Sequence, residues 1–211
     1  MKTFLSFLLT AAFFALCFHL SRCSDSFNAR HFNQLASDPE SQPEMILRSL
    51  EIKPGSVVAD LGAGGGYYTL RFSRAVGPSG KVYALDINQS YLDFIKTSME
   101  RQGIKNVRLI LAGERESGLP AGSTDLVFLR NVFHDMSDQA DYFRRLKTAL
   151  RKGGRIAIID YTPGGLVRRL HGHYSREEDI VDIMAKAGYI RYKRHTFLKD
   201  QSFNIFIPAE R

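Results

Sequence analysis

A glycine-rich turn follows a short apolar strand, and this combination limits the possible folds of the chain more than any other part of its sequence. The stretch Val57–Leu61 is apolar apart from Asp60, and Gly62, Gly64 and Gly66 follow it at alternate positions. Glycine lets the backbone turn sharply and lets a ligand approach the main chain. A strand, such a turn and then a helix together favour a nucleotide-like ligand. A turn without a ligand is the structural alternative, so the surrounding pattern must decide.

Apolar stretches of strand length alternate with amphipathic helical patterns through most of the chain. Parallel strands buried on both faces are expected at Val57–Leu61, Val82–Asp86, Val107–Leu111, Leu126–Arg130 and Arg155–Asp160. The pattern then changes, because Tyr189–Phe197 and Ser202–Ile207 are strand-like and joined by a short link, which predicts an antiparallel hairpin. The predicted fold class is therefore α/β, a Rossmann-like three-layer sandwich that ends in an antiparallel hairpin.

Capping and stop signals place helices between and after these strands. The expected helices run from Asn88 or Ser90 to Gly103, from Ser137 to Gly153-Gly154, and from a capping box at Ser175–Glu178 to Gly188. Residues 24–43 contain two X-Pro pairs and are predicted to form an irregular lead-in.

Acidic residues end the first two strands, at the edge where open parallel sheets bind ligands. Asp60 is expected to shape the glycine turn and to accept hydrogen bonds from a ligand ammonium or through water. Asp86 follows twenty-six residues later, at the end of the next strand. A carboxylate there can accept hydrogen bonds from both ribose hydroxyls of an adenosine ligand. A surface aspartate after a strand is the alternative interpretation of Asp86.

Polar residues follow the third and fourth strands at the same predicted edge. Gly113 and Glu114 come after the third strand, where a side chain can approach an adenine, although Glu114 could equally face water. Asn131 and His134 come after the fourth strand. The sequence therefore predicts a ligand site that is shared by the carboxyl ends of four strands.

Five stretches carry a resemblance to a known family: Ala59–Tyr68, Val76–Asp86, Leu119–Asp125, Asn131–His134 and Leu150–Asp160. Together they resemble class I methyltransferases dependent on S-adenosylmethionine (SAM), of the broad ubiquinone/menaquinone-biosynthesis type, over roughly residues 40–207. The resemblance implies a seven-stranded sheet of order 3-2-1-4-5-7-6 with strand seven antiparallel, SAM as cofactor and a small-molecule acceptor. The implied cofactor-binding residues are Asp60, Gly62, Ala63, Gly64, Gly66, Tyr67, Asp86, Ile87, Gly113, Glu114 and Asn131.

Three other functions remain as alternatives. A dehydrogenase that binds NAD would normally carry G-x-G-x-x-G, whereas this turn spaces its glycines evenly and aromatic residues follow. A protein that binds SAM without catalysis would look the same in sequence. The net charge of +7 raises the third alternative, a nucleic-acid methyltransferase, but the basic residues are spread out and no nucleic-acid-binding module is recognisable.

Methyl transfer from a sulfonium is a direct displacement, so the protein mainly has to align the acceptor with the methyl group. An acidic acceptor also needs a base. His134 is the preferred catalytic residue because it follows the fourth strand, although a histidine that closes the pocket or caps a helix is an equal alternative. Tyr161, His171 and His173 are weaker candidates.

The expected acceptor is a small apolar or aromatic molecule. Aromatic residues that could line its pocket are Phe27, Phe32, Tyr67, Tyr68 and Phe133, for which a core position is the alternative. No metal site is predicted, because His171-Gly-His173 alone supplies too few ligands.

Residues 1–23 are predicted to be a signal peptide or an N-terminal membrane anchor, and residues 24–211 the methyltransferase domain. Lys2 precedes an apolar run at residues 4–18, which is short for a membrane span. A buried first helix of the domain is the alternative. Both cysteines, Cys17 and Cys23, lie in this leader, so the body offers neither a disulfide nor a thiolate nucleophile. The chain would be exported or anchored at a membrane, or cytoplasmic if the leader does not function. The oligomeric state stays open.

Overall fold

The structure is a computed structural model that describes residues 25–164 and 173–210. The predicted leader at residues 1–23 and the candidate His171 lie outside the described residues. Within the part that is described, no helix combines the length and the apolar character that crossing a membrane requires.

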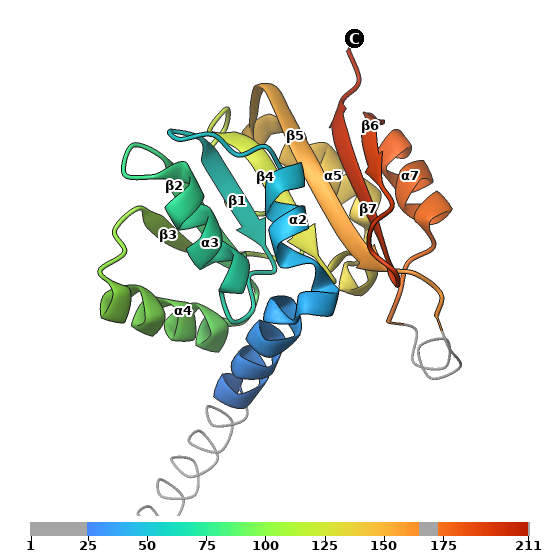
Figure 1. Ribbon diagram of the computed structural model, residues 1–211. Helices are drawn as coiled ribbons and strands as arrows, with labels where there is room; N and C mark the ends of the chain where they lie inside the picture. Colours follow the sequence, from blue (N-terminus) through green and yellow to red (C-terminus); the bar gives the residue numbers. More distant parts are fainter. Residues whose placement is uncertain (1–24, 165–172, 211) are drawn as a thin grey trace, which may run out of the picture.

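Seven strands form one sheet of order β3-β2-β1-β4-β5-β7-β6, which confirms the predicted order (Figure 1). The strands are β1 (Val57–Leu61), β2 (Lys81–Asp86), β3 (Val107–Leu111), β4 (Thr124–Arg130), β5 (Leu150–Tyr161), β6 (Tyr189–His195) and β7 (Gln201–Pro208). Neighbouring strands from β3 to β5 pair in parallel, and β7 pairs antiparallel with both β5 and β6. The predicted antiparallel hairpin is therefore confirmed.

Helices cover both faces of this sheet and complete the three-layer sandwich (Figure 1). They are α2 (Pro43–Ser49), α3 (Tyr67–Val76), α4 (Gln89–Gln102), α5 (Gln139–Leu146) and α7 (Glu177–Lys186). Successive strand residues point to opposite faces, so Val58 packs with the core under α2 and α3, whereas Ala59 packs with the core under α5 and α7. The ends of the central strands are thereby held rigidly between two apolar layers.

One helix was predicted too long. The helix expected from Ser137 to Gly153-Gly154 ends at Leu146, a short 3₁₀ turn follows, and β5 already begins at Leu150. Leu150 pairs with Thr124 of β4. Backbone pairing with a neighbouring strand has thus overridden the local helical pattern, which carries no information about that partner.

Of the predicted helix caps, the one at the start of α4 is confirmed and the one at the start of α7 is wrong. Asn88 caps α4 by accepting a hydrogen bond from the backbone N–H of Ser90, and the helix ends at Gly103 as predicted. The predicted capping box at Ser175 is wrong, because Arg176 occupies the N-cap of α7 and makes no side-chain cap. The Ser175 hydroxyl instead donates to the carboxylate of Asp160. This tertiary hydrogen bond takes the place of the predicted one to a backbone N–H in the first turn of α7.

Candidate functional site

A cavity of about 710 Å³ lies at the carboxyl ends of the parallel strands. Of the described residues that were predicted to bind the cofactor or to act in catalysis, all except Gly66 line it. Gly66 instead has a structural role as the N-cap of α3. Its φ is 83°, and a Cβ there would lie 2.7 Å from the Ile95 side chain, so only glycine fits. Gly62, the first residue after β1, also requires glycine. Its φ is 76°, and a Cβ there would lie 2.3 Å from the Val132 side chain.

A helical segment at residues 25–37 packs on the glycine turn, so the prediction of an irregular lead-in over residues 24–43 is wrong there. The side chain of Asn33 bridges the turn: its Nδ2 donates to the Gly65 carbonyl over 2.9 Å, and its Oδ1 accepts from the Tyr67 N–H over 3.1 Å. Phe32 lines the cavity and meets Tyr91 edge-on, with ring centroids 5.7 Å apart. This segment therefore forms one wall of the cavity.

Asp86 fastens the end of β2 to the glycine turn. Its Oδ2 accepts a hydrogen bond from the Gly64 N–H and its Oδ1 accepts one from the Asn88 N–H, each over 2.9 Å. Burial raises the pKa of Asp86, and these backbone hydrogen bonds oppose the rise. Asp86 lines the cavity beside Ile87, where its predicted contact with ribose hydroxyls stays a prediction.

Asp60 is nearly fully buried at the end of β1 and also lines the cavity. Its Oδ2 accepts a hydrogen bond from the Thr69 hydroxyl over 2.6 Å. Burial raises the pKa of Asp60 to about 7, the Thr69 hydrogen bond opposes the rise, and the nearby charge of Asp86 adds to it. A cationic ligand group in the cavity would favour the ionised carboxylate, because opposite charges stabilise each other.

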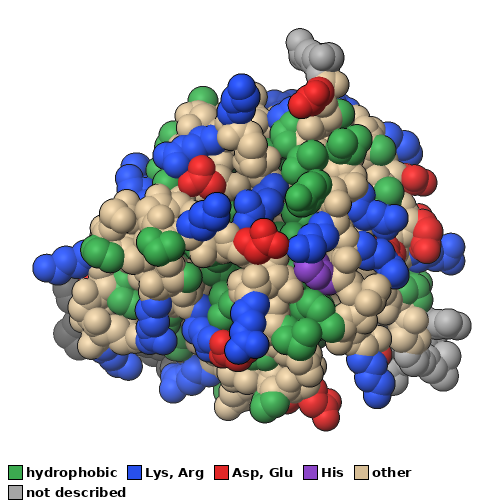
Figure 2. Space-filling view, turned by 45° about the horizontal axis from the view of Figure 1, so that its top comes forward, with side chains coloured by type: hydrophobic (Ala, Val, Ile, Leu, Met, Phe, Trp, Pro, Cys, Tyr) green, Lys and Arg blue, Asp and Glu red, His purple; other side chains and the backbone are tan. Residues whose placement is uncertain are grey.

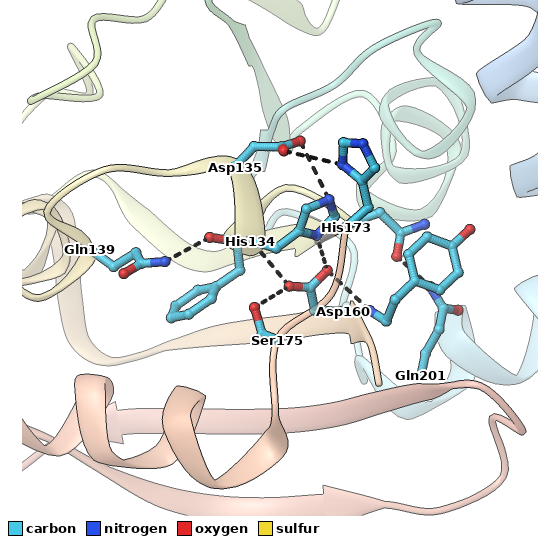
Figure 3. A network of polar contacts seen from close by, with 10 residues as sticks. His134, Asp135, Gln139, Asp160, His173, Ser175 and Gln201 are labelled. Atoms are coloured by element: carbon cyan, nitrogen blue, oxygen red, sulfur yellow. Dashed lines mark hydrogen bonds and ion pairs between the residues drawn. The ribbon is translucent and has the colours of Figure 1, made fainter. Parts of the chain in front are cut away.

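His134 and Asp160 form a polar network on the β4–β5 side of the cavity (Figure 3). Nδ1 of His134 lies 2.7 Å from Oδ1 of the fully buried Asp160. The backbone N–H groups of His134 and Tyr161 and the Ser175 hydroxyl also donate to this carboxylate. A carboxylate partner fixes the tautomer with hydrogen on Nδ1, which leaves Nε2 on the side of Asp135, 3.5 Å from its Oδ2.

Two effects oppose each other on His134. Burial lowers the pKa of its imidazole, but the hydrogen bond and charge of Asp160, with the charge of Asp135, raise it more, so the pKa lies above its ordinary value. Asp160 therefore stabilises the protonated imidazole as well as its orientation.

Two residues at the cavity, Asp160 and Arg130, were not predicted from the sequence. Asp160 was seen only as part of a strand, yet it lies near the end of β5, as Asp60 and Asp86 lie at the ends of their strands. Arg130 ends β4, lines the cavity, and donates to the Tyr68 hydroxyl over 2.6 Å and to Gln201 Oε1 over 3.0 Å. A charged residue that ends an otherwise apolar parallel strand is the signal that could have found both.

The predicted aromatic residues do not all reach the cavity. Phe32, Tyr67 and Tyr68 line it, as do the weaker catalytic candidates Tyr161 and His173. By contrast, Phe27 does not line the cavity, and Phe133 takes the alternative core position. Phe27 is 70% exposed on the helical segment, and Phe133 is buried in the core, where it stacks on Phe143 at a ring distance of 5.6 Å.

Comparisons with known proteins agree with this fold and site. The family model described as "Methyltransferase domain" matches residues 52–205. The chain is 31% identical over 112 residues to the ubiquinone/menaquinone biosynthesis C-methyltransferase UbiE of Hahella chejuensis, which is 53% of this chain and 45% of that protein. The chain thus spans about half the length of the curated relatives it matches.

Solved structures share the fold. A SAM-dependent methyltransferase from Aquifex aeolicus superposes with a TM-score of 0.72 at 24% identity, over 84% of this chain and 98% of that one. The trans-methyltransferase CalH, in complex with S-adenosylhomocysteine (SAH), superposes with a TM-score of 0.64 at 18% identity, over 74% of this chain and 52% of CalH. The family match, which covers most of the chain, shows that this protein belongs to the class I methyltransferase domain family, whose methyl donor is SAM.

Proposed function

We propose that the chain is an enzyme of the EC 2.1.1 class that transfers the SAM methyl group to a small apolar or aromatic acceptor. The observation that carries this proposal is a cavity that extends from the glycine turn, Asp60 and Asp86 to His134. A cofactor seated against the turn would share this cavity with an acceptor near His134. Holding both reactants in one cavity supplies the alignment on which a displacement depends.

Methyl transfer from SAM requires little from the protein beyond this alignment. The acceptor atom forms a bond to the methyl carbon, the carbon–sulfur bond breaks, and its electron pair stays on sulfur, which gives SAH. An acceptor that starts as a phenol or enol loses its proton in the process. We propose that His134 accepts this proton, because its side chain lines the cavity and Asp160 orients its ring.

The walls of the cavity support an apolar or aromatic acceptor. Phe32, Leu35, Tyr68, Phe128 and Met136 contribute apolar surface, and such surface favours ligands that lose apolar area to water on binding. Relatives named for ubiquinone/menaquinone biosynthesis and as a demethylmenaquinone methyltransferase support an aromatic, quinone-like acceptor class.

The test is transfer of labelled methyl from SAM to a panel of phenols, hydroquinones and enolisable ketones, with SAH formation measured in parallel. We expect a labelled organic product whose formation depends on His134. Tight SAM binding with no transfer to any extract of the source cells would instead support a protein that binds SAM without catalysis. Native mass spectrometry of the protein from its own source would identify an acceptor that stays bound.

A nucleic-acid acceptor has weaker support. Figure 2 shows Lys and Arg side chains spread over one face, with acidic and hydrophobic side chains between them. Nucleic-acid-binding domains usually gather such charges into a patch or stripe. Binding to RNA or DNA that weakens steeply with salt would favour this alternative.

We also propose that residues 1–23 act as an export leader or a membrane anchor. The proposal rests on Lys2 and the apolar run at residues 4–18. Fractionation of the cells that make the protein, with the mass of the chain measured in each fraction, tests it. A full-length chain found in the cytoplasm would contradict it.

A further inference from the structure

Three metal-ligating side chains meet in the cavity, on its His134 side. Nε2 of His134 lies 3.5 Å from Oδ2 of Asp135, and Nδ1 of His173 lies 3.8 Å from Oδ1 of the same carboxylate (Figure 3). One ligand atom from each of the three residues lies within 4.8 Å of the others, and all three residues line the cavity. We propose that His134, Asp135 and His173 bind a divalent transition-metal ion.

The spacing suits such an ion. Zinc lies about 2.0–2.2 Å from imidazole nitrogen and carboxylate oxygen, so two ligands of a tetrahedral ion are about 3.4 Å apart. The pairs around Asp135 are already close to that spacing. Asp135 and His173 are both largely exposed, so small rotations of their side chains can close the remaining gap. Two imidazoles and one carboxylate favour Zn²⁺ or Fe²⁺ over Mg²⁺, which prefers oxygen ligands.

Asp160 supplies the outer support that metal-binding histidines usually have. Its buried carboxylate holds Nδ1 of His134, which directs Nε2 toward Asp135. Ser175 and the backbone N–H of Tyr161 hold the carboxylate in turn. A histidine with only a packing role would not need a fully buried carboxylate, itself held by several hydrogen-bond donors, to fix the orientation of its ring.

The position of the ion suggests what it does. Three protein ligands leave a coordination position open, as in catalytic zinc sites, and the site borders the cavity. An acceptor oxygen bound there would be held beside the cofactor. With the ion bound, His134 would serve as its ligand rather than as the group that accepts the acceptor's proton. This role rests on the proposed methyl transfer, whereas ion binding does not. No metal site was predicted from the sequence, because His171-Gly-His173 alone supplies too few ligands and Asp135 is distant from them in the chain.

Calorimetric titration of the full chain with Zn²⁺ tests the proposal. The titration is best made with Cys17→Ser and Cys23→Ser, because these leader thiols can themselves bind zinc. We expect a site that His173→Ala weakens by at least about 100-fold, because one of three ligands is lost. Asp160→Asn should weaken it by about 10–100-fold through the outer shell. His31→Ala, which changes an exposed histidine on the helical segment, should leave the affinity unchanged.

Equal Zn²⁺ affinity in His173→Ala and His31→Ala would overturn the site. Asp135→Asn provides a second test at an exposed position, where loss of the fold is not expected. Visible absorption of Co²⁺ in place of Zn²⁺ reports the ligand set directly, and its bands should disappear in His173→Ala. A chain that binds Zn²⁺ through these residues yet transfers no methyl group would support the site and refute the proposed function. Methyl transfer that survives complete chelation would overturn the role given to the ion.

Discussion

The imidazole of His134 is held by the carboxylate of Asp160, with Nδ1 and Oδ1 2.7 Å apart. The two residues come from different elements, the 3₁₀ turn after β4 and the end of β5. Because Asp160 is fully buried and accepts several hydrogen bonds, the ring of His134 has a set orientation at the cavity wall.

His134→Ala should lower kcat by about 10²–10⁴-fold, the usual contribution of a group that assists proton transfer. SAM affinity should stay nearly unchanged, because the glycine turn, Asp60 and Asp86 belong to β1 and β2, whereas His134 follows β4. Steady-state kinetics and calorimetry measure the two effects. His31→Ala is the matched control at an exposed histidine. A loss confined to KM would mean that His134 only positions the acceptor, and full activity would exclude both roles.

Asp86→Ala should weaken SAM binding at least about tenfold in calorimetry. The change removes two expected hydrogen bonds to ribose, each worth about 1.5–3 kcal/mol when the acceptor is charged. It also frees the N–H of Gly64 in the cofactor turn. Asp179→Ala, at an exposed position of α7, should bind SAM normally. Unchanged affinity in Asp86→Ala would remove the ribose assignment.

Asn33→Ala should lower the melting temperature by about 2–12 °C. The side chain makes two hydrogen bonds to the glycine turn, each worth about 0.5–1.5 kcal/mol, and 1 kcal/mol corresponds to about 2–4 °C for a domain of this size. SAM affinity should also fall, because the turn loses its support. Gln34→Ala, with an exposed side chain on the same segment, should change neither. Equal effects of the two substitutions would show that the Asn33 bridge does not stabilise the turn.

Asp60 should make the protein less stable as pH rises from about 4 to 7. Its pKa is raised to about 7 in the folded chain from an ordinary 3.8, so between these values the folded state binds more protons than the unfolded state. The free energy of unfolding must then fall with rising pH. Asp86, whose pKa burial also raises, adds a slope of the same sign. Asp60→Asn should flatten the decline when melting temperatures are measured across this range, and an unchanged slope would contradict the assignment.

A chain that begins at Ser24 should keep the melting temperature and SAM affinity of the full chain. A chain that begins at Asp38 should lose SAM affinity, because it lacks the helical segment that packs on the glycine turn. Thermal denaturation of both chains measures the melting temperatures, and calorimetry measures the SAM affinities. Unfolding of the chain that begins at Ser24 would show that the predicted leader is instead a helix of the fold.

The parallel strands and the cofactor turn could be predicted from local sequence patterns. Val57–Leu61 matches β1 at both ends, and the turn glycines adopt positive φ. Both are local properties: a strand buried on two faces is apolar at nearly every position, and a tight turn with positive φ favours residues without a Cβ. Asp60 and Asp86 could be placed together because parallel strands bring their carboxyl ends to one edge.

The remaining contacts of the site could not be predicted from the sequence, because they join elements that are distant in the chain. The helical segment at residues 25–37 is fastened by Asn33 to a turn 32 residues away, and Asp160 reaches His134 across 26 residues. Likewise His173, which follows β5 in the chain, reaches Asp135 in the turn after β4. Each contact joins side chains from separate elements, whose distance depends on how those elements pack. Local periodicity and capping signals carry no information about such packing, so these partners emerge only when the chain is folded.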